Sequence, residues 1–138
     1  MSNTEADSRA PRLLLVDDEP NHLELINKLL GLEFDSTGVS IEIITAKNVA
    51  EALLVLSGDN EETKPGGVVV DGLEGDCWEV LKFARGVGCL AILWSNNDDL
   101  LDRARAENTP ALLKTRGMKP LLDLIVETFP FARPAIVE

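Results

Sequence analysis

The chain has 138 residues, 45% of them hydrophobic, which is enough for one domain with a sizeable core. There are 24 acidic and 13 basic residues, so the net charge of −11 disfavours direct binding to nucleic acid or to an anionic membrane. No apolar run approaches the roughly 20 residues that span a bilayer, and the polar N-terminus lacks the apolar centre of a signal peptide. We therefore expect a soluble, cytoplasmic protein.

The outer segments differ in composition from the middle of the chain. Residues 1–11 are polar and without periodicity, so we expect an N-terminal extension, then a single domain over 12–129 and a tail or linker over 130–138. Cys77 and Cys89 stand in no metal-ligand spacing and are too few for a disulfide framework, which favours a reducing compartment and a role in packing.

The first predicted strand is the apolar run 13–16, which ends in Asp17 and Asp18. A continuous apolar run of this length is typical of a parallel strand buried on both faces. Pro20 suits a first helical turn, and apolar residues at helical spacing predict a helix that ends at Gly31.

The same alternation of strand and helix continues to the end of the domain. Residues 41–44 alternate in polarity, so we place that strand at an edge of the sheet. The other predicted elements, in chain order, are a helix over 49–56, a polar loop over 57–67, a strand over 68–70 ending in Asp71, a helix ending near Gly86, a strand over 90–94 ending in Ser95, a helix over 98–108, a strand over 111–113 ending in Lys114, and a helix through Phe129. Alternating strands and helices predict an α/β fold with a parallel sheet covered on both faces.

Polar side chains follow nearly every predicted strand. Because the carboxyl ends of parallel strands share one edge of the sheet, we expect these side chains to form one site there: Asp17, Asp18, Asp71, Ser95 and Lys114. Clustered carboxylates repel one another, and a hard divalent cation with oxygen ligands, Mg²⁺ above all, makes such a cluster tolerable.

The chemistry indicated is phosphoryl transfer. A carboxylate beside the metal can attack phosphorus, and Asp71 is the best placed to do so. Lys114 and Ser95 are suited to contact phosphoryl oxygens. The chain has neither a GxxxxGK[ST] loop nor a GxGxxG turn after the first strand, which argues against nucleotide binding.

Each of these residues also has a purely structural interpretation. An acid at a strand end often caps the next helix, and Asp18 or Glu19 is placed to do that. Capping by Ser95 is as good an interpretation as a phosphate contact. We assign no function to His22 and a packing role to the two tryptophans.

Several motifs together resemble the receiver domain of two-component response regulators. They are LLLVDDEPNHLELINKLL, TAKNVAEALLVL, VVVD, WEVLKFAR, AILWS and LLK, in the family's order from Arg12 to about Phe129. The resemblance implies a flavodoxin-like fold with a five-stranded parallel sheet in the order 2-1-3-4-5. It also implies that Asp17, Asp18, Asp71 and the backbone carbonyl of Leu73 hold Mg²⁺, that Asp71 is phosphorylated, and that Ser95 and Lys114 bind the phosphoryl group.

The function implied by this resemblance is a signalling switch rather than an enzyme. The phosphoryl group would come from a histidine kinase or a His-containing phosphotransfer protein. A downstream protein would contact the face formed by the helix over 98–108, the strand over 111–113 and the last helix, without direct contact to nucleic acid or membrane.

The chain departs from the family's pattern at four places. The loop after Asp71 is about two residues short, Asn96 stands where a small residue is usual, Ala111 replaces an aromatic residue, and Thr115 replaces a proline. These departures support an alternative, a pseudo-receiver that binds partners without phosphorylation. A third alternative, a phosphatase with an aspartyl-phosphate intermediate, typically has an acid two residues after the nucleophile, where this chain has Leu73.

Overall fold

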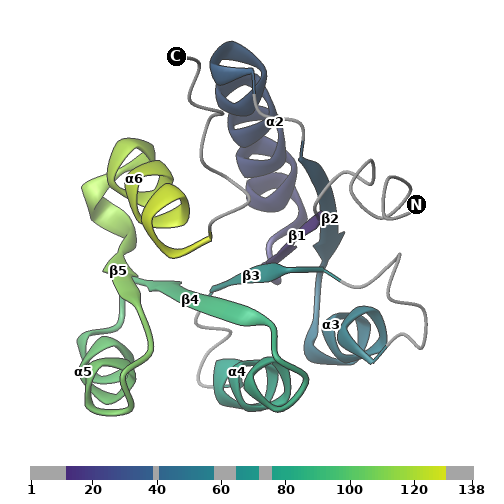
Figure 1. Cartoon of the computed structure of the whole chain (residues 1–138). Coiled ribbons are helices and arrows are strands. Elements are labelled where there is room, and N and C mark those ends of the chain that lie inside the picture. Colours follow the sequence, from purple (N-terminus) through teal and green to yellow (C-terminus); the bar gives the residue numbers. More distant parts are fainter. Residues whose placement is uncertain (1–11, 39–40, 58–64, 72–75, 130–138) are drawn as a thin grey trace, which may run out of the picture.

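The computed structural model describes residues 12–38, 41–57, 65–71 and 76–129, and the expected extension, tail and most of the polar loop lie outside these ranges. Five parallel strands form one sheet in the order β2-β1-β3-β4-β5 (Figure 1), as expected from the resemblance. The elements in chain order are β1 (Arg12–Val16), α2 (Pro20–Thr37), β2 (Glu42–Ala46), α3 (Val49–Leu56), β3 (Gly67–Asp71), α4 (Cys77–Gly86), β4 (Leu90–Ser95), α5 (Asp98–Ala106), β5 (Ala111–Leu113), the 3-10 helix η2 (Lys114–Arg116) and α6 (Met118–Thr128).

The two most apolar strands lie at the centre of the sheet. β1 and β3 pair with each other and are almost completely buried, because helices cover both of their faces. β2 is a partly exposed edge strand, as its alternating sequence predicts. The strand order changes direction between β1 and β3, so the crevice for a ligand falls at the ends of these two strands.

Side chains of successive strand residues enter two separate cores. In β1, Leu14 and Val16 pack under α3, α4 and α5, whereas Leu13 and Leu15 pack under α2 and α6. Figure 1 shows these two groups of helices on opposite faces of the sheet. The period of two along a strand therefore decides which face each strand-end side chain is directed to.

The first helix is longer than the sequence predicts. We expected it to end at Gly31, but α2 continues to Thr37 and ends at Gly38, which has a φ of 78°. Phe34 continues the buried stripe of Leu30 past Gly31, and the burial of this ring outweighs the low helix propensity of one glycine. The true end is the glycine in the left-handed conformation, where a Cβ would be strained.

Two smaller predictions were also inaccurate at their boundaries. The helix expected over 98–108 is α5, Asp98–Ala106, and it is followed by a turn with Asn108 at a φ of 60°. The strand expected over 41–44 is shifted to Glu42–Ala46 by its pairing with β1.

Among the helices that the structure describes, none has the length and hydropathy needed to cross a bilayer.

A close contact at the start of β3 gives a stability test. A Cβ at Gly67 would lie 2.8 Å from Cε1 of the fully buried Phe129, whereas a Cβ at Gly31 would meet no atom within 4 Å. We expect Gly67→Ala to lower the free energy of unfolding by about 1–3 kcal/mol through overpacking. Gly31→Ala should raise it by about 0.5–1 kcal/mol through helix propensity. Urea unfolding followed by circular dichroism measures both, and equal effects would contradict the assigned packing of Phe129.

Candidate functional site

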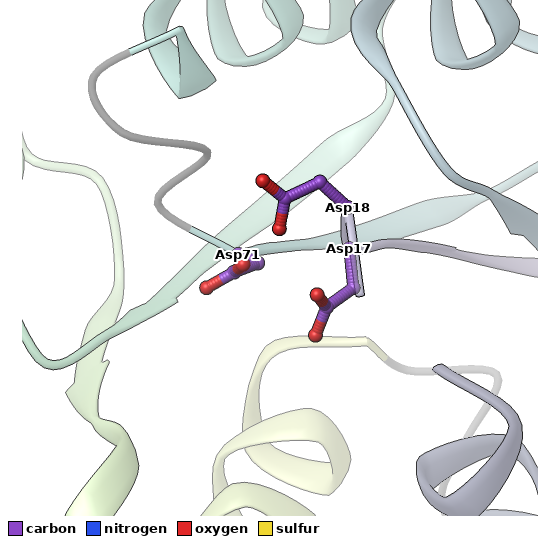
Figure 2. A group of neighbouring side chains, drawn as sticks. All are labelled: Asp17, Asp18 and Asp71. Atoms are coloured by element: carbon purple, nitrogen blue, oxygen red, sulfur yellow. The ribbon is translucent and has the colours of Figure 1, made fainter. Parts of the chain in front are cut away.

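Three carboxylates meet where β1 and β3 end. Asp17 and Asp18 follow β1, and Asp71 is the last residue of β3, the strand beside it. One carboxylate oxygen from each lies within 4.8 Å of the others. Figure 2 shows the three side chains around one point, with those of Asp17 and Asp18 directed to opposite sides. This divergence follows from the alternation of side chains along β1.

Lys114 follows β5, the edge strand of the sheet, and reaches the same carboxylates. Its Nζ lies 2.6 Å from Oδ1 of Asp71 and 3.6 Å from Oδ2 of Asp17. The side chains of Lys114 and Asp71 are each only 16% exposed, so their attraction is screened less than that of a surface pair. One ammonium group thus offsets part of the charge of two carboxylates, one after β1 and one at the end of β3.

Asp17 is the most buried member of the cluster, with 3% of its surface exposed. Its Oδ1 accepts a hydrogen bond of 2.9 Å from the backbone N–H of Glu19, and its Oδ2 lies 2.5 Å from Nδ1 of His22. Of the two residues considered as caps of α2, Glu19 rather than Asp18 occupies the N-cap position, but its side chain makes no capping hydrogen bond. Asp17 instead stabilises the turn that leads into the helix.

His22 and Trp94 are site residues that the sequence reasoning missed. The imidazole of His22 stacks on the ring of Trp94, with centroids 5.8 Å apart and planes 12° apart. Nζ of Lys114 lies 5.3 Å from the centre of the same ring. Trp94 packs in the core under α2 and α6, as expected of a packing residue, but it also supports two groups that contact Asp17.

A signal for His22 does exist in the sequence. His22, Ile26 and Leu30 are spaced by four residues, so they lie on one face of α2. Ile26 and Leu30 are core residues on this face, which packs on the same side of the sheet as Leu13 and Leu15. Leu13, Leu15 and Asp17 alternate in the same direction along the chain, so Asp17 is directed to the α2 side as well. A histidine in the first turn of α2 is therefore close to it.

Ser95 is buried, with 4% of its surface exposed, at the end of β4. Its hydroxyl accepts a hydrogen bond of 3.0 Å from the backbone N–H of Asn97. Asn97, not Ser95, is the N-cap of α5, since its side chain accepts from the N–H groups of Asp99 and Leu100. The interpretation of Ser95 as the helix cap is therefore wrong. Ser95 is the next residue after Trp94, which pairs with Asp71 in the sheet.

Two of the unusual residues interact with each other. The side-chain carbonyl of Asn96 accepts a hydrogen bond of 3.1 Å from the backbone N–H of Thr115. A proline at position 115 has no N–H and could not make this bond. The pair ties the segment that carries Lys114 to the end of β4. The aromatic ring beside Lys114 comes from Trp94 in β4, since position 111 in β5 is alanine.

The donor set suits a hard divalent cation. Carboxylate oxygens are the ligands that Mg²⁺ prefers. Asp17, Asp18 and Asp71 each offer one such oxygen within 4.8 Å of the other two, so these three residues could hold the ion together. Leu73, whose backbone carbonyl was expected to complete the metal shell, lies outside the described residues.

Solved structures similar to this chain include two response-regulator proteins. TrrA from Thermotoga maritima, in complex with Mg²⁺–BeF, is 26% identical, covers 86% of this chain and 99% of its own, and has a TM-score of 0.67. The receiver domain of the Francisella response regulator 1452 is 19% identical, covers 89% of this chain and 97% of its own, and has a TM-score of 0.65. No family model matches the chain, and no curated protein matches it by sequence.

The expected resemblance to response-regulator receiver domains is confirmed, and the chain has their fold. A de novo designed Rossmann 2x3 protein is also similar, with 12% identity over 92% of this chain and a TM-score of 0.66. The fold therefore does not define the function by itself. What distinguishes this chain is the set of side chains at the strand ends.

Both cysteines are buried and have raised pKa values. Burial raises the pKa of Cys77 to about 11, partly offset by a backbone hydrogen bond, and burial raises the pKa of Cys89 to about 12. A thiol that ionises so far above neutral pH is a poor nucleophile, because the thiolate is the reactive form. These residues therefore behave as core side chains, as the sequence predicts.

We expect iodoacetamide to label neither cysteine of the folded protein at neutral pH, and both in urea. The unfolded thiols ionise near pH 9.0, below the folded values of about 11 and 12, so the unfolded chain binds fewer protons in this interval. Stability from these groups is therefore complete below pH 9.0 and is lost as the pH rises to about 11 for Cys77 and about 12 for Cys89. Intact-mass analysis of labelling against pH tests this, and fast native labelling at neutral pH would contradict it.

Proposed function

We propose that the chain is a receiver domain that accepts a phosphoryl group on Asp71 with the help of Mg²⁺. The observation that carries this proposal is the joint placement of Asp71 in an acidic cluster and in a 2.6 Å ion pair with Lys114. A metal-binding cluster alone needs no lysine, and a structural ion pair alone needs no second and third carboxylate. A site that holds a dianionic phosphoryl group beside a cation uses both.

Asp71 is the proposed nucleophile. Its carboxylate oxygen attacks phosphorus, forming the new O–P bond of an acyl phosphate. With a phosphohistidine donor the P–N bond breaks, its electron pair stays on the imidazole nitrogen, and a proton from solvent neutralises that nitrogen. Asp71 is suited to this role because it is the last residue of β3 and only partly buried, so that an incoming group can reach it.

Asp17, Asp18 and Asp71 would hold the Mg²⁺ ion. When bound, the ion neutralises charge on the transferring phosphoryl group. The similar TrrA structure contains Mg²⁺–BeF, which supports a site of this class. The acidic cluster of this chain offers the oxygen ligands that such an ion takes.

Lys114 and Ser95 would contact the phosphoryl oxygens. Lys114 already compensates the charge of Asp71, and its flexible stem allows the ammonium group to follow a phosphoryl oxygen added to that carboxylate. Ser95 lies at the end of β4, next to the strand of Asp71, and its hydroxyl proton remains available because Ser95 acts as an acceptor toward Asn97.

The partners proposed for this function are proteins. A histidine kinase or a His-containing phosphotransfer protein would supply the phosphoryl group. A downstream protein would contact the face formed by α5, β5 and α6. The turnover of a separate substrate is not part of the proposal.

The second candidate is a pseudo-receiver that binds a partner without phosphorylation. The observation in its favour is that Lys114 already pairs with Asp71 and that the Asn96–Thr115 hydrogen bond fastens the Lys114 segment. Such a site is satisfied without a phosphoryl group. The following experiment separates the two candidates.

We expect incubation with acetyl phosphate and Mg²⁺ to add the mass of one phosphoryl group to the protein. Asp71→Asn should abolish the addition while the fold is kept, because the substitution removes the nucleophilic charge without changing shape. Asp99→Asn, which removes an exposed acid in the first turn of α5, is the matched control and should react like the wild type. Intact-mass spectrometry measures the addition, and an unchanged wild-type mass would favour the pseudo-receiver.

We expect Asp17→Asn and Asp18→Asn each to weaken Mg²⁺ binding by at least about tenfold, since each removes a charged ligand from a three-carboxylate site. Isothermal titration calorimetry measures the dissociation constants. Asp99→Asn again serves as the control with unchanged affinity. Wild-type affinity in both site variants would place the metal elsewhere.

A further inference from the structure

We propose that His22 is a positioning residue that holds the carboxylate of Asp17 for metal binding. This inference rests on the proposed function, because it concerns the metal of the same site. His22 does not belong to the group of three ligand residues, so its action is exerted through Asp17.

The first observation is the pattern of contacts around Asp17. The backbone N–H of Glu19 donates to Oδ1, and Nδ1 of His22 lies 2.5 Å from Oδ2. A carboxylate oxygen accepts only, so Nδ1 carries the proton and donates it. With both oxygens bound from the side of α2, the carboxylate cannot rotate freely. Figure 2 shows that the Asp17 side chain is directed away from that of Asp18, in agreement with this restraint.

The second observation is that Lys114 contacts both Asp71 and Asp17, whereas the contact of His22 with the cluster is with Asp17. Nζ of Lys114 lies 2.6 Å from Asp71 but 3.6 Å from Asp17, so its stronger contact is with the phosphoacceptor. When the ammonium group follows a phosphoryl group on Asp71, Asp17 loses a distant partner. His22 comes from α2 and is independent of that movement, so it keeps Asp17 oriented in both states.

The third observation is that Trp94 fixes the plane of the imidazole. The two rings are nearly parallel, at 12°, with centroids 5.8 Å apart. Trp94 is buried, and its indole N–H has no acceptor among the described residues. Packing against the core, rather than a hydrogen bond, therefore positions this ring. An imidazole stacked on a buried aromatic side chain presents its Nδ1 in a defined direction. This arrangement pre-organises the hydrogen bond to Asp17 before any metal binds.

Partners that hydrogen-bond a metal ligand orient it and tune its basicity, and their loss typically reduces metal affinity by about 10- to 100-fold. His22 makes this contact to the most buried carboxylate of the cluster, where a wrong orientation is least easily corrected by solvent. We therefore expect its removal to weaken metal binding by about tenfold.

Three variants separate the hydrogen bond from the ring. His22→Phe keeps a ring that can stack on Trp94 and removes the donor. His22→Asn replaces the ring with an amide nitrogen the same number of bonds from Cα as Nδ1, so the donor is kept. His22→Gln carries its amide one bond farther out and serves as a second variant without a matched donor. Asn21→Ala, at an exposed neighbouring position in α2, is the control.

The readout is Mn²⁺ binding, followed by the electron paramagnetic resonance signal of the free ion, with folding checked by circular dichroism. We expect His22→Phe and His22→Gln to bind about tenfold more weakly than the wild type, and His22→Asn and Asn21→Ala to bind within about twofold of it. Wild-type affinity in His22→Phe, or equal weakening in His22→Asn and His22→Phe, would overturn the inference.

The same experiment distinguishes failure of the inference from failure of the proposed function. A wild type that binds no Mn²⁺ overturns both. A wild type that binds Mn²⁺ and is phosphorylated by acetyl phosphate, with folded His22→Phe unchanged in affinity, overturns only the role of His22. The expected order of affinities in a protein that acetyl phosphate does not modify supports the role of His22 and overturns the phosphoacceptor function.

Discussion

The site depends on holding three like charges close together at the end of a buried sheet. Carboxylate oxygens within 4.8 Å repel one another, and the nearby apolar core screens them little. The chain meets this cost with the ammonium group of Lys114, at the start of η2, and an imidazole from α2. The negative charge that remains would attract the divalent cation of the proposed site, so the repulsion that disfavours the empty cluster would favour metal binding.

The central pair of strands positions this cluster. β1 and β3 are buried on both faces and paired in register up to Val16 and Val70, and Asp17, Asp18 and Asp71 follow directly. Alternation along β1 sends Asp17 toward the α2 face and Asp18 the other way, which surrounds a central point rather than stacking the acids on one side. The helices therefore do more than cover apolar surface, because α2 also supplies the partner of the most buried acid.

The sheet and its strand-end residues could be predicted from the sequence because their signal is local. An apolar run followed by an acid defines both a strand and its end, and parallel topology then places the ends together. The end of α2 was missed because Gly31 is a local signal that the distant packing of Phe34 overrides. The Asn96–Thr115 hydrogen bond joins residues 19 apart in sequence, and no periodicity reports such a pair.

His22 is intermediate between the residues that local patterns predict and those that depend on long-range contacts. It belongs to the site, but no sequence motif identifies it. Its face of α2 is given by the four-residue spacing to Ile26, and the face of Asp17 is given by the alternation of β1. Neither pattern alone assigns a function, and a lone histidine with a partly exposed side chain is usually without one. Only the two patterns together place an imidazole against a buried carboxylate. Since a designed protein with 12% identity has a similar backbone, such pairings of side chains, rather than the sheet itself, are where a function specific to this chain is encoded.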